Sequence, residues 1–141
     1  MHINRHGLQF KRSECWDNST LNKIIVIWLK KFKEECERCS VQGVPNYDEF
    51  RNNDGDLDFD KWMSAIQFII ESLDADKPEY KGDFIAGKND GKVSESESTC
   101  WDFKPDSETK WEEYKAATKT YYYNRKKALE LFTKYYEDLW N

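Results

Sequence analysis

The chain has 141 residues and a net charge of -5, and 35% of its residues are charged, 38% hydrophobic and 16% aromatic. This length favours a single domain, residues 1–141, around one core built largely of aromatic rings. The 22 basic and 27 acidic residues disfavour both the basic stripe of a nucleic-acid binder and the charge excess of a DNA mimic.

Residues 1–12 alternate weakly between apolar and polar side chains, which predicts a short N-terminal arm or edge strand. Asn18, Ser19 and Thr20 then precede apolar residues spaced three and four apart, from Leu21 to Cys36. This spacing predicts a first helix over residues 19–38 with one apolar face.

Gly43 and Pro45 should end that helix, and the asparagines and glycine at 52–55 predict a turn. Asp58 is placed to cap a second helix, whose apolar positions run to Leu73. The oxygen-rich segment 52–60 does not fit a calcium loop. If Gly55 took the sixth position, Phe50 and Lys61 would stand where carboxylates are required.

Residues 75–104 are rich in Gly, Ser and Glu, which predicts a long irregular loop or a partly disordered insertion. No Pro or Gly follows Pro105, so we expect a long C-terminal helix from there onward, either continuous or with a bend. The predicted fold class is therefore mainly α, with a three-helix core.

The sequence offers little that could catalyse a reaction. His2 and His6 are the only histidines, and neither glycine-rich phosphate-binding motif occurs. We therefore predict a protein that is not an enzyme and has no cofactor.

Four cysteines, Cys15, Cys36, Cys39 and Cys100, are too few for a secreted disulfide framework, which favours reduced thiols. The pair Cys36 and Cys39 could hold zinc if Cys15 with Cys100, or His2 with His6, completed the site. Since Cys36 belongs to the apolar helix face, we favour a buried cysteine and no metal.

The candidate site is Tyr121, Tyr122 and Tyr123, followed by Arg125. Successive helical positions point about 100 degrees apart, so three consecutive rings cannot all face one core. Exposed rings beside a cation can anchor a protein partner or stack on a small anionic ligand. The alternative interpretation is that residues 75–104 cover them.

Two blocks of the chain carry a resemblance to known sequences. The first comprises residues 15–34 and 58–63, and the second comprises residues 128–140. Together they resemble a group of small uncharacterised proteins of tailed bacteriophages. The resemblance implies a viral protein with a helical fold, and it brings no active site.

We therefore expect a non-enzymatic phage accessory protein that binds a host protein, for example against a host defence. An anionic nucleotide held by the tyrosines and Arg125, or a minor virion or assembly role, is the alternative. The longest apolar run, residues 24–29, is too short to cross a bilayer, and no secretory signal opens the chain, so we expect the host cytoplasm and no membrane partner. An exposed aromatic face on the last helix is also compatible with a homodimer.

Overall fold

The structure is a computed structural model that describes residues 2–4, 7–9, 18–39, 43–88 and 101–139, and the side chains within 19–39, 43–86 and 103–139. The chain divides into two compact units. We call residues 1–76 with 123–141 the helical unit, and residues 77–122 the hairpin unit. The predicted single domain stays a prediction.

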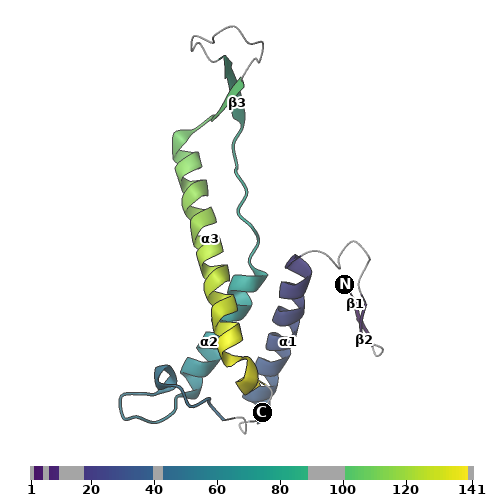
Figure 1. Cartoon of the computed structure of the whole chain (residues 1–141), viewed down its shortest axis with the longest axis vertical. Helices are drawn as coiled ribbons and strands as arrows, with labels where there is room; N and C mark the ends of the chain where they lie inside the picture. The colour runs from purple at the N-terminus through teal and green to yellow at the C-terminus, as the bar shows by residue number, and fades with distance from the viewer. Residues whose placement is uncertain (1, 5–6, 10–17, 40–42, 89–100, 140–141) are drawn as a thin grey trace. The chain divides into compact units, whose positions relative to one another are not determined.

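The helical unit contains the predicted three-helix core. Helix α1 (Asn18–Cys39), helix α2 (Phe59–Asp74) and the C-terminal part of helix α3 (Glu108–Tyr135) lie side by side in Figure 1. A short 3-10 helix, η2 (Asp48–Phe50), precedes α2, and another, η3 (Tyr136–Leu139), follows α3. The predicted mainly α fold is confirmed.

The N-terminal residues form two short strands. Strand β1 (His2–Asn4) pairs antiparallel with strand β2 (Gly7–Gln9), and Ile3 lies opposite Leu8. Within the weakly alternating segment 1–12, residues 2–4 and 7–9 thus form two paired strands.

Helix α1 begins one residue before the predicted start and ends one residue after the predicted end. Its buried apolar side chains are Ile25, Val26, Leu29 and Cys36. The prediction that the apolar face starts at Leu21 is wrong, because Leu21 is 60% exposed and the buried face begins one helical turn later.

Helix α2 starts where the sequence predicted. The carboxylate of Asp58 accepts hydrogen bonds from the backbone N–H groups of Asp60 and Lys61, at 3.0 and 3.2 Å. These bonds satisfy two donors that would otherwise lack a partner at the helix N-terminus. The helix then buries its apolar face on α1, with Trp62, Ile66 and Ile69 almost inaccessible.

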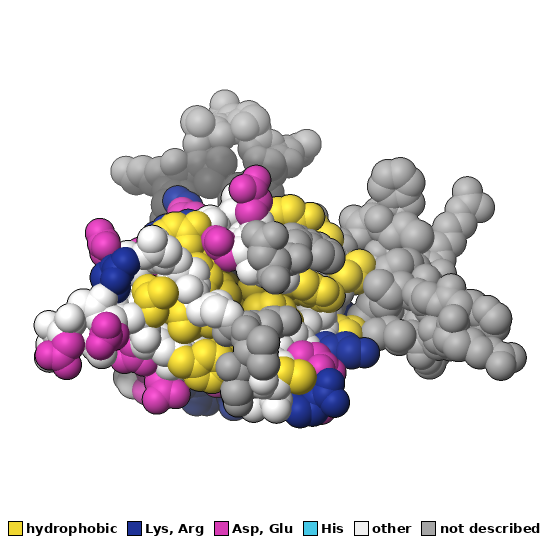
Figure 2. Space-filling model, turned by 90° about the horizontal axis from the view of Figure 1, so that it is seen from below, with side chains coloured by type: hydrophobic (Ala, Val, Ile, Leu, Met, Phe, Trp, Pro, Cys, Tyr) yellow, Lys and Arg dark blue, Asp and Glu magenta, His cyan; other side chains and the backbone are white. Residues whose placement is uncertain are grey.

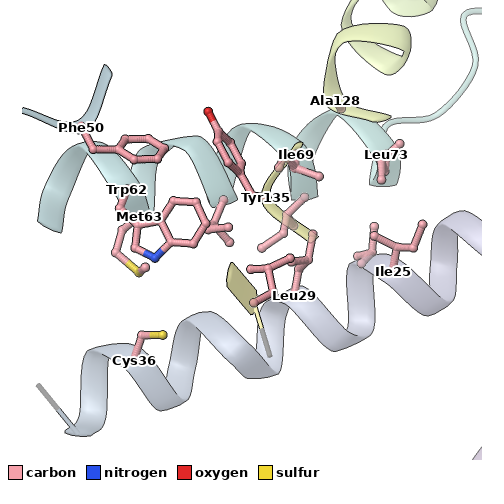
Figure 3. Packing of buried hydrophobic residues seen from close by; sticks show 14 residues of the cluster. Ile25, Leu29, Cys36, Phe50, Trp62, Met63, Ile69, Leu73, Ala128 and Tyr135 are labelled. Atoms are coloured by element: carbon pink, nitrogen blue, oxygen red, sulfur yellow. The ribbon is translucent and has the colours of Figure 1, made fainter. Parts of the chain in front are cut away.

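Aromatic rings fill one end of the core, as the composition predicted. Phe50, Trp62 and Tyr135 come from η2, α2 and α3, and their ring centroids lie 5.1 to 5.3 Å apart. Figure 3 shows the Tyr135 ring beside those of Phe50 and Trp62, with its hydroxyl directed away from α1. Burying each such side chain contributes roughly 1.5 to 3 kcal/mol to folding, so this contact fixes η2 against two helices.

The hairpin unit contains two strands that the sequence analysis did not predict. Strand β3 (Phe84–Lys88) pairs antiparallel with strand β4 (Trp101–Pro105), and Phe84 lies opposite Pro105. Both lie largely within the predicted loop 75–104, whose residues 89–100 fall outside the described part. The remainder of the unit is an extended segment before β3 and the first turns of α3.

The long C-terminal helix is confirmed as one continuous α3 of 28 residues that passes into η3. Within the described residues, no helix combines the length and the apolar character that a bilayer span requires.

Candidate functional site

The predicted tyrosines lie on the exposed part of α3. Tyr122 is 52% exposed and Tyr123 is 67% exposed, whereas Tyr121 is half-buried. The rings of Tyr121 and Tyr122 meet edge to face, with centroids 5.2 Å apart. The expectation that at least one of the three rings is exposed is therefore confirmed.

The Arg125 side chain contacts the backbone of α2. Its guanidinium donates a hydrogen bond of 3.5 Å to the carbonyl of Leu73, near the C-terminal end of α2. Tyr121 and Tyr122 lie four and three positions before Arg125 on α3, so both are neighbours of Arg125 on the helix surface. The binding role of Tyr121, Tyr122, Tyr123 and Arg125 stays a prediction.

The candidate metal ligands do not form a cluster in the described residues. Cys36 is buried at 1% exposure, while Cys39 is exposed. Burial raises the pKa of the Cys36 thiol, and the nearby Cys39 raises it further. Cys15, His6, Cys100 and the side chain of His2 lie outside the described part, and within that part no three His, Cys, Asp or Glu side chains come close enough to share an ion.

The hairpin unit contains an aromatic cluster that the sequence analysis missed. The ring of Tyr80 contacts those of Phe84, Trp111 and Tyr114, with centroids 5.1 to 5.8 Å apart. The Tyr80 hydroxyl donates a hydrogen bond of 2.6 Å to Asp106, and this bond holds the pKa of the Asp106 carboxyl below its ordinary value. The extended segment before β3 is thereby attached to α3.

Three large apolar side chains of this unit remain at the surface. Phe84, Ile85 and Phe103 are 49%, 60% and 66% exposed, and we call them the apolar hairpin surface. Phe84 and Phe103 belong to one face of the two-stranded sheet, because Phe84 pairs with Pro105, and Ala86 with Phe103. Ile85, opposite Lys104, belongs to the other face. The alternation of Trp101, Asp102, Phe103 and Lys104 was the sequence signal that could have indicated β4.

A group of interacting polar side chains lies in the helical unit, where α3 ends. The Lys134 ammonium contacts both oxygens of the Glu49 carboxylate at 2.6 and 2.7 Å, and the Tyr135 hydroxyl also donates to Glu49. The Tyr47 hydroxyl donates a hydrogen bond of 2.8 Å to Asp138. We call these five residues the C-terminal network.

The C-terminal network shifts the titration of its members. The hydrogen bonds from Lys134 and Tyr135 lower the pKa of Glu49. Burial and the bond to Glu49 raise the pKa of Tyr135, and the bond to Asp138 raises that of Tyr47. All three pKa shifts favour an ionised Glu49 and neutral Tyr135 and Tyr47 hydroxyls, which are the states that form these hydrogen bonds.

No family model, curated protein or solved structure matches this chain. The resemblance of residues 15–34, 58–63 and 128–140 to phage proteins stays a prediction.

Proposed function

We propose that the protein acts by binding another protein and that the apolar hairpin surface takes part in the contact. The observation that supports this is the exposure of Phe84, Ile85 and Phe103 in a unit that buries little of its own side-chain surface. Among its described side chains, within 77–86 and 103–122, none is fully buried. Exposed apolar side chains on one face, such as Phe84 and Phe103, are typical of interaction surfaces, and aromatic rings often supply much of the binding energy.

In this proposal the partner is a host protein, the setting is the host cytoplasm, and the protein belongs to a phage. The binding itself is the function, for example the blocking of a host defence, and neither a reaction nor a cofactor is involved. The setting depends on the phage resemblance, and the binding surface depends on the exposed side chains of the hairpin unit.

A pull-down with the tagged full chain from host lysate tests the proposal. The double variant Ile85→Ser, Phe103→Ser removes two exposed apolar side chains and should fold like the parent, because neither is buried. We expect the parent to retain one host protein in stoichiometric amount and the double variant to lose it.

Leu21→Ser is the matched control, because Leu21 is also apolar and 60% exposed but lies on α1. It should retain the host protein. Loss of the partner in both variants, or in neither, would count against the apolar hairpin surface. Light scattering of the purified proteins tests whether a second copy of the chain covers the surface instead of a host protein. A dimer that forms in the parent but not in the double variant would assign the surface to a second copy.

The predicted alternative is the sequestration of an anionic nucleotide by the tyrosines and Arg125. The exposure of Tyr122 and Tyr123 favours it, whereas the contact of Arg125 with the Leu73 carbonyl leaves the guanidinium partly engaged. A thermal-shift series with a nucleotide panel tests it, because a ligand at a hundredfold excess over its Kd adds about 2.7 kcal/mol of stability. The absence of a shift with every nucleotide would exclude it.

A further inference from the structure

The C-terminal network borders a hollow that no part of the proposed function uses. The hollow has a volume of about 450 Å³, and its lining includes the rings of Tyr47, Phe132 and Tyr136 and the side chains of Lys134, Glu137 and Asp138. This volume lies within the range of small-ligand sites, roughly 300 to 1,000 Å³. Figure 2 shows the molecule from below, where apolar side chains reach the surface beside acidic ones.

Three features of this hollow favour a cation. The faces of its aromatic rings carry the negative part of the ring quadrupole. Glu137 and Asp138 line it with two carboxylates, and Lys134 forms an ion pair with Glu49. The hollow also lies where α3 ends, and the C-terminal end of a helix carries a partial negative charge.

The fold already holds one ammonium group against rings at this place. The Lys134 nitrogen lies 5.0 Å from the centre of the Tyr47 ring and 5.4 Å from that of Tyr135. Both distances are within the range of a cation–π contact, which extends to about 6 Å. An ammonium group therefore already contacts the face of Tyr47, one of the rings that line the hollow.

We propose that the hollow binds an organic cation, an ammonium or guanidinium group, between the rings of Phe132 and Tyr136 and the carboxylates of Glu137 and Asp138. The cation can belong to a small molecule or to a Lys or Arg side chain of a partner. The apolar hairpin surface belongs to the other unit, so this site and the proposed function can fail independently.

Choline and a short acetylated, amidated peptide with one central Arg are the probes. Both are titrated into the isotope-labelled full chain, and the backbone amide shifts are followed by NMR. We expect saturable shifts confined mainly to residues 132–138. Binding of choline would show that a free cation suffices, and binding of the peptide alone would assign the site to a partner's side chain.

Dimethylbutanol, the neutral carbon isostere of choline, tests whether charge is recognised. It should cause no comparable shifts. Equal shifts with this alcohol, or the absence of saturable shifts at 132–138 with both cationic probes, would overturn the proposal.

Variants of Tyr136 test whether the aromatic ring is needed, and a variant of Glu137 tests whether the negative charge is needed. Tyr136, at 47% exposure, can be replaced without opening the core. For the cationic probe that binds the parent, Tyr136→Leu should weaken the affinity roughly tenfold, because it removes the aromatic ring. Tyr136→Phe keeps the ring and should retain the affinity. Glu137→Gln should weaken binding by a similar factor.

Glu130→Gln is the control for the loss of one negative charge, since Glu130 lies on α3 but does not line the hollow. It should bind that probe like the parent. Equal weakening by Glu130→Gln and Glu137→Gln would reduce the effect to the net charge of the protein and would contradict a defined site.

Discussion

Individual residues determine the shape of the loop between α1 and α2. The side-chain oxygen of Asn52 accepts hydrogen bonds of 2.9 Å from the backbone N–H groups of Asp54 and Asp56. Arg51 donates to the Gly55 carbonyl at 2.6 Å, and Gly55 itself has a φ of 87 degrees. The oxygen-rich segment, whose spacing does not fit a calcium loop, is thus a turn closed by its own hydrogen bonds.

Replacing Gly55 with Ala should destabilise the protein by about 1 kcal/mol, because a positive φ places a Cβ close to its own backbone. No other atom lies within 4 Å of the added Cβ, so backbone strain is the only cost. Urea unfolding measures the change. Gly43→Ala is the control, since its Cβ also meets no neighbour and its φ is not in the strained range. Equal losses in the two variants would contradict the explanation.

Glu49 should make the stability of the helical unit dependent on pH. Because its pKa is lower in the folded chain than in the unfolded chain, its contribution is present above the unfolded value of about 4.3 and is lost as the pH falls through the folded value. Glu49→Gln should therefore lower the free energy of unfolding near neutral pH by at most about 1 kcal/mol, since the Glu49 and Lys134 side chains are each 42% exposed.

Urea unfolding of the parent and Glu49→Gln, repeated from about pH 7 down to about pH 3, checks this expectation. The difference between the two proteins should shrink on acidification. A difference that stays constant or grows would show that the carboxylate charge is not what stabilises the contact with Lys134 and Tyr135.

At the scale of elements, each helix is specified by local signals and held by distant partners. Helix α2 has a defined N-terminus at Asp58 and a continuous apolar face. Its position relative to α3 depends on Trp62, which meets Tyr135 edge to face at 5.3 Å. Local signals thus decide where a helix begins, and side-chain packing decides what it contacts.

Asp58→Ala should cost about 1 kcal/mol, because two N–H groups at the start of α2 lose their acceptor. Asp58→Asn should retain most of the stability, since an amide oxygen caps a helix about as well as a carboxylate. Thermal and urea unfolding compare the two. An alanine variant as stable as the parent would exclude a role for this cap.

For the whole molecule, burial is unequal between the two units. The fully buried apolar side chains among the described residues all belong to the helical unit. The hairpin unit has an aromatic cluster and the apolar hairpin surface, both partly accessible to solvent. Stability and the proposed binding function are therefore assigned to different units.

A matched pair of substitutions tests this division. Ile66 is fully buried, and Ile85 is 60% exposed. Ile66→Ala should lower the free energy of unfolding by about 2 to 5 kcal/mol, because it removes buried methyl groups and leaves a cavity. Ile85→Ala should change it by no more than about 0.5 kcal/mol. Similar losses at both positions, measured by urea unfolding, would show that the hairpin unit contributes a core of its own.

The helices were predictable from sequence because their signals are local. Apolar spacing, the Asp58 cap and the positions of the prolines placed three helices within a few residues of their observed ends. The strands β3 and β4 were not predicted, because the Gly- and Ser-rich residues between them obscured two short alternating segments whose pairing joins residues far apart.

The amino-acid sequence by itself determined the helical class, the aromatic core and the turn before α2, since each follows from residues a few positions apart. Only the tertiary structure decided which side chains remain exposed and which distant ones meet. Tyr135 and Glu49 are 86 positions apart, and no periodicity within either segment encodes their contact. The apolar hairpin surface and the hollow at the end of α3 both depend on such long-range packing, whose free energy arises only once the chain has folded.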